Sequence, residues 1–416
     1  MSFCLKSAYT DEVIAAQQEG LPLNFEGLKV AIFKSIHEVP QDWETAQPAD
    51  NCFLHRDYLS VVERTPSIDI VYRYLIFYKN GFPCGVGFCP LYHYKNSESI
   101  KELREKQDSF KFSVWLKKTL SAPLNFNLLI VGNNLLTGEH GFHFNEHYVP
   151  KETVVPVIEN TIKVLSASLR KDGKKVHGYF IKDLIEDRKS GRQFLADKQF
   201  HEFTFNPNMF LSIRPEWDSF EDYLAAMTSK ARTRLKKAMK VANYLEVREL
   251  SVSQIEAHQN EITHLFKNVA DRVAFNMVQI KPNYFLELKR ELGEQFKLYA
   301  YFDPTVEGGK MVAFHTAFIK GKDYDAHFLG FEPAYNHKCK LYLNILLNLV
   351  RQGIELKSET IIFSRTAMEI KSSVGAVPEN LYGYIRACNN LINWVLGRIV
   401  RYFEPSIEWK PRHPFK

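Results

Sequence analysis

Two neighbouring segments, MVAFHTAFIK (Met311–Lys320) and DYDAHFLGF (Asp323–Phe331), decide the fold of this chain. Both are rich in β-branched and aromatic residues, which is typical of strands, and the short link around Gly321 predicts a tight turn between them. The apolar residues of LYLNILLNLVRQGIEL (341–356) recur at helical spacing, and TIIFSRTA (360–367) again has the composition of a strand. The order is therefore strand, strand, helix, strand.

Two more elements follow in the same region. MEIKSSVGA (368–376) predicts a helix, and NLYGYIRA (380–387) predicts a final strand. Where a helix begins just after a strand, its first backbone amides are unpaired and its dipole favours an anion. The turn between the second strand and the long helix is therefore a candidate site for a phosphate-bearing ligand.

The length of 416 residues exceeds what one hydrophobic core usually organises, so we expect two domains. The order hairpin, strand, loop, helix, strand occurs in the first half, and a similar order returns in the second half. Turn signals at Asn206-Pro207 and Arg214-Pro215 place the boundary between the two halves of the chain in this region. We predict an α/β protein with mixed sheets flanked by helices, and domains at residues 1–207 and 208–416.

Composition and charge narrow the class of protein. The net charge of +6 suits an anionic ligand, six scattered cysteines suit a reducing compartment, and no apolar run is long enough to span a membrane. We expect a cytoplasmic protein that has no secretory signal. The His-rich GEHGFHFNEH (138–147) reads as a loop rather than a metal site, so no metal is expected. LINWVLGRIVRYF (391–403) reads as a packed helix, with peripheral contact to a membrane surface as the alternative.

A basic helix is expected at SKARTRLKKAMKVA (Ser229–Ala242). Helical spacing of four and three brings Lys230, Arg234 and Lys237 to one side of it. Like charges on one helix face repel each other, which favours an anionic partner such as a substrate or tRNA. A solvated surface helix explains the same pattern, and the sequence leaves both readings open.

These segments together carry a family resemblance. The basic helix, the strand meander, YLNILLNLVRQGIE and FSRTAMEIKSSVGA resemble a bacterial GNAT-like family of peptidoglycan biosynthesis and recognition proteins, which is related to the FemABX aminoacyl transferases. The resemblance covers about Trp217 to Ile385 well and the first half more loosely. It implies two tandem GNAT-like domains and transfer of an acyl or aminoacyl group from acyl-CoA or aminoacyl-tRNA to an amine, with a peptidoglycan precursor as one acceptor. The acetyl-CoA motif Q/R-x-x-G-x-G/A is absent after Phe331, so the donor stays open.

The candidate site residues fall into three groups. The donor group lies in the turn after the second strand, where lysines and helix amides would meet phosphates: Gly330, Phe331, Tyr335, Asn336, Lys338 and Lys340. The catalytic group contains two strand histidines that could face each other and accept a proton from the amine, and one arginine: His327, His315 and Arg365. The substrate group combines the basic helix with the residues after Phe363: Lys230, Arg234, Lys237, Thr366 and Lys371.

Each of these residues also has a structural explanation. A histidine on an apolar strand is often a satisfied core residue, and Thr366 could simply cap a helix. No permanently bound cofactor is expected, and Cys339 and Cys388 lack a recognisable histidine partner for covalent catalysis. The rival hypothesis is a non-catalytic GNAT-like module that binds cell-wall fragments or RNA.

Overall fold

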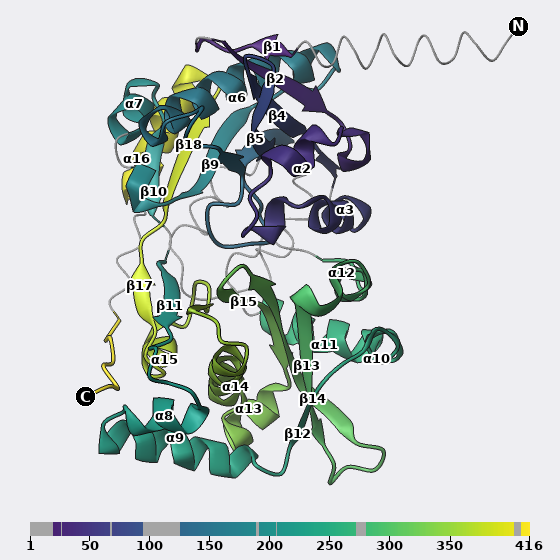
Figure 1. Ribbon diagram of the computed structural model, residues 1–416, viewed down its shortest axis with the longest axis vertical. Coiled ribbons are helices and arrows are strands. Elements are labelled where there is room, and N and C mark those ends of the chain that lie inside the picture. Colours follow the sequence, from purple (N-terminus) through teal and green to yellow (C-terminus); the bar gives the residue numbers. More distant parts are fainter. Residues whose placement is uncertain are drawn as a thin grey trace, which may run out of the picture. The chain divides into compact units, whose positions relative to one another are not determined.

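The chain forms two compact units (Figure 1). The computed structural model describes residues 20–25, 27–66, 69–94, 125–188, 191–204, 206–271, 280–402 and 409–416. Unit 1 consists of Met1–Ala49, Phe53–Phe205 and Leu381–Glu404, and unit 2 consists of Asp50–Cys52, Asn206–Asn380 and Pro405–Lys416. Both units are mixed α/β structures in which helices flank the sheets.

Unit 1 contains a five-stranded sheet of order β1-β2-β4-β5-β8 and a six-stranded sheet of order β10-β18-β9-β7-β6-β3. Its strands are β1 Leu21–Pro22, β2 Leu28–Phe33, β3 Ile70–Val71, β4 Tyr74–Lys79, β5 Phe82–Phe88, β6 Leu91–Tyr94, β7 Phe126–Val131, β8 Phe142–Phe144, β9 Gly178–Leu184, β10 His201–Thr204 and β18 Tyr382–Ala387. Its helices are α2 Asp42–Ala46, α3 Arg56–Arg64, α6 Val154–Lys171, α7 Gly191–Asp197 and α16 Asn390–Tyr402. The predicted hairpin is β4 and β5, joined through Asn80 and Gly81, which both have positive φ.

Unit 2 is built on one seven-stranded sheet of order β12-β13-β14-β15-β16-β11-β17. Its strands are β11 Asn208–Ser212, β12 Glu246–Glu249, β13 Phe296–Asp303, β14 Lys310–Lys320, β15 Asp323–Phe331, β16 Thr360–Ile362 and β17 Val377–Glu379. Its helices are α8 Phe220–Ala225, α9 Ser229–Ala242, α10 Val252–Ala257, α11 Gln259–Ala270, α12 Tyr284–Leu292, α13 Pro333–Cys339, α14 Leu341–Glu355 and α15 Met368–Ser372. Helix α14 covers one face of the sheet, and α11 and α12 cover the other (Figure 1).

The same local pairing occurs in both units. In unit 1, β7 runs through α6 to a parallel β9, and β18 lies antiparallel between β9 and β10. In unit 2, β15 runs through α13 and α14 to a parallel β16, and β11 lies antiparallel between β16 and β17. This repeated topology is the two-copy α/β arrangement that the sequence predicted.

The inserted strand of unit 2, β11, stands near the start of that unit and precedes its other strands in the sequence. The inserted strand of unit 1, β18, follows the strands of unit 2 and completes the sheet of unit 1. The domain limits expected from sequence, 1–207 and 208–416, placed β18 in the second domain. A strand's composition predicts that it is a strand, but its partner is decided by long-range pairing, which the composition does not encode.

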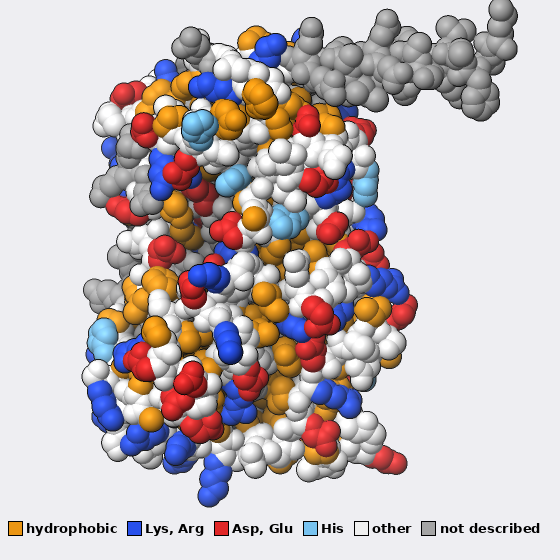
Figure 2. Space-filling view, viewed as in Figure 1, with side chains coloured by type: hydrophobic (Ala, Val, Ile, Leu, Met, Phe, Trp, Pro, Cys, Tyr) orange, Lys and Arg blue, Asp and Glu red, His pale blue; other side chains and the backbone are white. Residues whose placement is uncertain are grey.

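Helix α9 has the bounds predicted from sequence. It begins after Thr228, whose hydroxyl accepts a hydrogen bond from the Ala231 amide at 3.4 Å. Leu235 and Ala238 are buried, and the exposed lysines lie on the other side of the helix. Figure 2 shows Lys and Arg side chains gathered over the lower part of the molecule, where Figure 1 places α8 and α9.

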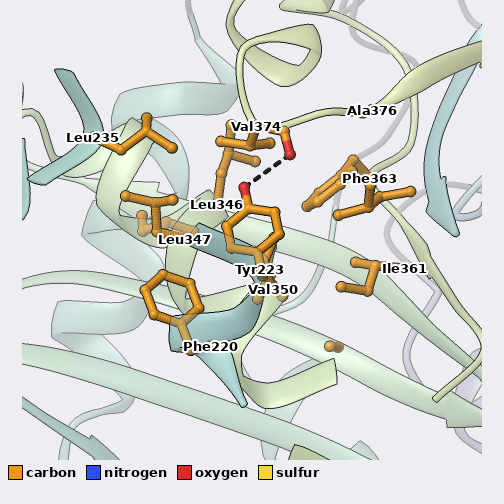
Figure 3. Packing of buried hydrophobic residues seen from close by; sticks show 14 of the residues in the cluster. Phe220, Tyr223, Leu235, Leu346, Leu347, Val350, Ile361, Phe363, Val374 and Ala376 are labelled. Carbon is orange, nitrogen blue, oxygen red and sulfur yellow. Dashed lines mark hydrogen bonds between the residues drawn. The ribbon is translucent and has the colours of Figure 1, made fainter. Parts of the chain in front are cut away.

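The core of unit 2 packs α8, α9 and α14 around the sheet. Figure 3 shows Tyr223 among Phe220, Leu346 and Val350, with its hydroxyl donating to the Val374 carbonyl at 2.8 Å. Tyr223 is fully buried, so this hydrogen bond ties the chain after α15 to the centre of the core.

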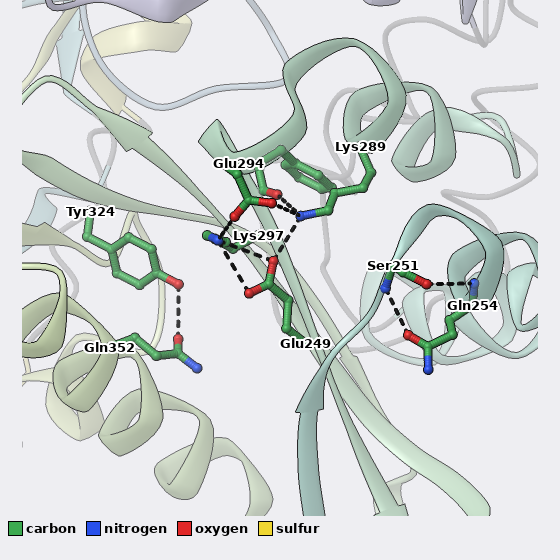
Figure 4. Close-up of polar contacts among 9 residues, drawn as sticks. Glu249, Ser251, Gln254, Lys289, Glu294, Lys297, Tyr324 and Gln352 are labelled. Carbon is green, nitrogen blue, oxygen red and sulfur yellow. Dashed lines mark hydrogen bonds and ion pairs between the residues drawn. The ribbon is translucent and has the colours of Figure 1, made fainter.

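Ion pairs connect helix α12 of unit 2 to strands β12 and β13. Lys289 on α12 and Lys297 on β13 are both buried, and both pair with Glu249 on β12 (Figure 4). Glu294 adds a second partner for Lys297. These ion pairs join α12 to the sheet edge, and each buried ammonium group has the partner that burial requires.

Candidate active site

Strands β15 and β16 pair in parallel over three residues and then separate. The paired positions are Asp323 with Thr360, Tyr324 with Ile361, and Asp325 with Ile362. Strand β16 ends there, whereas β15 continues to Phe331 and pairs with β14 alone. Beyond Asp325, the edge of β15 that faced β16 therefore offers backbone groups that the β16 ladder does not occupy.

A β-bulge in β15 follows immediately. Ala317 pairs with Ala326 and His315 pairs with Leu329, so β15 has one more residue than β14 in this interval. The Thr316 hydroxyl accepts a hydrogen bond from the Phe328 amide at 2.9 Å and donates to the Phe328 carbonyl at 3.1 Å. The bulge breaks the alternation of side chains that the sequence predicted for β15. Bulges often lie beside active sites because they re-aim backbone groups.

Asp325 occupies the last paired position of β15 and is a residue that the sequence analysis did not select. Its carboxylate is buried, and burial raises its pKa to about 7, while the Lys320 ammonium 3.8 Å away opposes that shift. A carboxyl group that titrates near neutrality suits proton transfer at pH 7. The sequence signal was an aspartate at an inward position of an apolar strand.

The segment after β16 has an unusual backbone. Ser364, Thr366 and Ala367 have positive φ values of 63°, 69° and 48°. Residues other than glycine avoid this region because of a steric cost, and such conformations concentrate at functional sites. Ala367 is the residue that precedes α15, and no side chain caps this helix. The prediction that Thr366 caps the helix is therefore wrong, and Thr366 is instead exposed.

The side chain of Lys371 fixes this segment through hydrogen bonds to its backbone. Its ammonium donates to the carbonyls of Ser364 at 3.0 Å and Arg365 at 2.6 Å. The side chain is buried, and this burial lowers the pKa of Lys371 to about 7. The sequence placed Lys371 on the substrate, whereas the structure places it under the loop that presents Arg365 and Thr366.

One residue of the basic helix α9, Arg234, contacts the segment at the end of α15. The Arg234 guanidinium donates to the Ser373 carbonyl at 3.3 Å, close to the end of α15. Burial and the nearby Arg412 lower the pKa of Arg234. Lys230 and Lys237 are exposed. The structure thus joins Arg234 to the segment of Lys371, whereas the two lysines remain surface groups.

The two histidines predicted as a pair lie on opposite faces of the sheet. His315 contacts Gln352 on α14, with 3.0 Å between Nε2 and Oε1, and His327 lies 3.0 Å from the Tyr284 hydroxyl on α12. They therefore do not act on one substrate together, as the sequence analysis had expected. The bulge and the helix on each face explain the separation.

His327 has an environment that disfavours a role as a base. Its ring centroid lies 4.0 Å from that of Phe328 and 4.9 Å from that of Phe318. Burial among these rings lowers the pKa of His327 to about 3. An imidazole with this pKa stays neutral at pH 7 and accepts a proton poorly.

His315 belongs to a buried hydrogen-bond network. Its Nδ1 accepts from the Tyr301 hydroxyl at 3.1 Å, and its Nε2 donates to Gln352, which also accepts from Tyr324 at 3.0 Å (Figure 4). The Tyr301 hydroxyl accepts from Asn348 at 2.9 Å. Burial lowers the pKa of His315 to about 4. These contacts identify His315 as a structural residue of the core.

The predicted donor turn is a short helix, α13, followed by α14. Lys340 joins the two helices with a φ of 54°, and the Asn336 side chain accepts from the Tyr342 amide at 3.0 Å. One of the amides at the start of α14 is thus already paired. Lys338 and Lys340 are exposed, and the Lys338 ammonium lies over the ring of Tyr244 at 5.2 Å.

The remaining donor candidates have structural roles. Tyr335 donates to Asp303 at 2.8 Å, and Phe331 is buried in the core. A Cβ at Gly330 would overlap the backbone of Leu265 on α11, so close packing of helix on strand requires glycine there. Only Lys338 and Lys340 of the six donor candidates present a charge to a ligand.

Unit 1 has a buried ion pair at the corresponding end of β9. The Lys182 ammonium contacts the Asp183 carboxylate and donates to the Leu136 carbonyl at 2.6 Å. The Gly138 amide donates to the same carboxylate at 3.0 Å, and Asp183 has a φ of 59°. The sequence analysis overlooked this pair, although Lys-Asp inside the apolar strand GYFIKDL was a visible signal.

A cavity of about 400 Å³ lies at the opposite edge of the unit 2 sheet from β16. Arg248, His258, Phe302 and Glu307 are among the residues that line it. The Arg248 guanidinium lies over the Phe302 ring at 4.1 Å. Because β13, β14 and β15 separate this edge from β16, the cavity belongs to a different part of the unit from Lys371.

The described part of the chain lacks two features, a metal-binding cluster and a membrane-spanning helix. No group of three or more His, Cys, Asp or Glu there is placed to hold a metal ion. Helices long and apolar enough to cross a bilayer are likewise missing from it.

Comparison with known proteins gives structural neighbours only. No protein-family model and no curated sequence matches the chain. Among solved structures, FemX aligns with 10% identity and a TM-score of 0.49 over 82% of this chain and 93% of its own. A tandem GNAT protein of the clavulanic acid biosynthesis pathway aligns with 9% identity and a TM-score of 0.48, over 87% of this chain and 99% of its own.

A third neighbour is the C-terminal domain of a protein described as a lysylphosphatidylglycerol synthetase from Agrobacterium fabrum. It aligns with 9% identity and a TM-score of 0.45, over 90% of this chain and 98% of its own. The repeated α/β topology of the present chain is shown by its own strand pairings, described above.

Proposed function

We propose that unit 2 is an N-acyltransferase centre that moves an acyl or aminoacyl group from a carrier to an amine. One observation carries this proposal: two groups with a pKa of about 7, Asp325 and Lys371, flank the point where β15 and β16 separate. Strongly perturbed ionisable groups concentrate at functional sites. The bulge in β15 and the left-handed residues after β16 lie at the same point.

The chemistry requires a base and an oxyanion site. A neutral amine attacks the carrier's carbonyl, the N–C bond forms, and the bond to the carrier sulfur or oxygen breaks. In our proposal, Asp325 accepts the amine proton, and that proton then passes to the leaving thiolate or alkoxide. Backbone amides of β15 beyond Asp325 stabilise the tetrahedral oxyanion.

Lys371 acts as a positioning residue in this proposal. Its hydrogen bonds to the carbonyls of Ser364 and Arg365 compensate for the strained backbone. The loop then presents Arg365 and Thr366, and Arg234 lies nearby through Ser373. Guanidinium groups suit a carboxylate or phosphate of the acceptor.

The carrier would bind at the start of α14. Lys338 and Lys340 supply positive charge there, and the unpaired amides of a helix N-terminus supply directed donors for phosphate. Acyl-CoA and aminoacyl-tRNA both fit this chemistry. A peptidoglycan precursor as acceptor rests on the family resemblance alone.

Binding and turnover can be tested together. Thermal unfolding with CoA, acetyl-CoA and aminoacyl-tRNA should show stabilisation by the true carrier, about 2.7 kcal/mol at 100 times its dissociation constant. Transfer to amine acceptors should then fall at least about 100-fold in Asp325→Asn, as expected for loss of a general base. Asp323→Asn, two residues away at a less buried position, is the matched control and should retain activity.

The outcomes separate the two hypotheses. If Asp325→Asn transfers the group as fast as the unaltered protein, Asp325 is not the base. Stabilisation by a carrier without any transfer would favour the alternative function, a non-catalytic module that binds cell-wall fragments or RNA. Exposed lysines of α9 support the RNA version, for which binding should weaken steeply with salt.

A further inference from the structure

Helix α16 packs on unit 1 through its small and polar residues. The Asn393 side chain accepts from the Ala387 amide at 2.8 Å and donates to the Gln199 carbonyl at 3.0 Å. One turn later, a Cβ at Gly397 would overlap the ring of His201. Among the described residues of α16, Asn393 and Gly397 are the buried ones, and neither contributes a large apolar side chain to this contact.

The apolar residues of α16 point to solvent. The exposed fractions of Leu391, Ile392 and Trp394 are 72%, 60% and 57%. Val395 and Ile399 are partly exposed. Val395 lies three residues after Ile392 and Ile399 four residues after Val395, so they continue the apolar row along the helix. An amphipathic helix normally buries such a row against its own protein. Here the row is left open, and a contiguous apolar patch of this kind marks an interaction surface.

The charges beside this row have one sign. The Arg398 guanidinium lies over the Trp394 ring at 4.0 Å, and Arg401 follows on the same side of the helix. The sequence of α16, NLINWVLGRIVRY, contains no aspartate or glutamate. The surface therefore combines exposed Leu, Ile and Trp with arginine, which complements an apolar layer covered by anionic groups.

We propose that α16 binds peripherally to a membrane surface that carries anionic lipids. Its 13 residues are too few to span a bilayer, which takes about 20, so the helix would lie in the plane of the interface. Leu391, Ile392 and Trp394 would enter the acyl boundary, while Arg398 and Arg401 contact the headgroups. A symmetric contact between two copies would bring these arginines together, so the charge favours lipid over a second copy.

Vesicle co-sedimentation tests the proposal with the full chain. Vesicles of phosphatidylcholine with about one-third phosphatidylglycerol should bind the protein, and phosphatidylcholine alone should bind it much less. The double variant Leu391→Ser, Ile392→Ser keeps every charge, and its affinity for the vesicles should fall at least about tenfold because the apolar anchors are removed. Phe82→Ser is the control, since Phe82 is a 62% exposed aromatic residue elsewhere on unit 1 and its loss should change nothing.

A second measurement, tryptophan fluorescence, tests whether helix α16 itself contacts the lipid. Tryptophan emission should shift to the blue on adding the anionic vesicles, and Trp394→Phe should remove this shift. Vesicle binding that survives the double variant, or that is lost equally in Phe82→Ser, overturns the proposal. So does binding that disappears only when Lys237 of α9 is changed to Gln, because a different surface would then be responsible. Self-association that the double variant abolishes, without lipid binding, would assign the patch to a second copy.

Discussion

Acid should weaken unit 2 through the buried His315. The imidazole is neutral in the folded state, where burial lowers the pKa of His315 to about 4, and an unfolded histidine has a pKa of about 6.5. Because the folded pKa is the lower one, the contribution to stability is fully present above pH 6.5 and is lost as pH falls from 6.5 towards 4. At 1.36 kcal/mol per pKa unit, the free energy of unfolding should fall by about 2.5 kcal/mol by pH 4.5 from this group.

The variant His315→Gln isolates this effect. Glutamine does not titrate, so the loss between pH 7 and pH 4.5 should be about 2.5 kcal/mol smaller in the variant than in the unaltered protein. Any constant cost of replacing the ring drops out, because only the dependence on pH is compared. Hydrogen exchange of β14 and α14 peptides in urea measures the free energy of unfolding of unit 2 alone.

A control guards against a general acid effect. His337→Gln changes an exposed histidine on α13 and should leave the pH dependence as it was. Equal pH dependence in His315→Gln and the unaltered protein would refute the reasoning, because the hydrogen-bonded ring between Tyr301 and Gln352 would then carry no linkage to folding.

Three further predictions concern unit 2. Tyr223→Phe should lower the free energy of unfolding by about 1–3 kcal/mol, because it leaves the buried Val374 carbonyl unpaired; urea unfolding measures this, and an unchanged midpoint would contradict it. Gly330→Ala should destabilise by about 1–3 kcal/mol, since its Cβ overlaps the Leu265 backbone; a thermal shift assay that finds equal or higher stability would show that the two elements can move apart. Once a carrier is known, the transfer rate should rise with pH through about 7 as Asp325 ionises, and a rate independent of pH from 5.5 to 8 would speak against this base.

Local sequence patterns predicted several of the elements of unit 2. Helix α9 and the strands β14 and β15 lie within one residue of their expected bounds, because periodicity and composition specify them. Helix α13 was read as a turn, since a seven-residue helix with mixed polar residues gives no periodic signal. The bulge at Phe328 was also invisible, because it depends on a contact with Thr316 of the neighbouring strand.

The candidate site was only partly predictable. The sequence singled out the segment from Arg365 to Lys371, where the structure has strained backbone and a buried ammonium group. It did not reveal that Lys371 points under the loop, because orientation depends on which carbonyls the fold brings near. Asp325 was passed over in favour of His327, since residue type suggests a base, whereas the burial that sets a pKa is a property of the three-dimensional structure.

The place of β18 in the sequence makes the folding of unit 1 depend on residues that are synthesised after most of unit 2. As the chain leaves the ribosome, domains generally fold in order from the N-terminus. Unit 1, however, needs Tyr382–Ala387 to fill the place between β9 and β10, and these residues are made only after residues 206–380 of unit 2. Until then, the nascent unit 1 has a gap in its sheet with unpaired strand edges. A gene cut between residues 207 and 208 would make this gap permanent, so the two halves are not expected to fold as separate proteins.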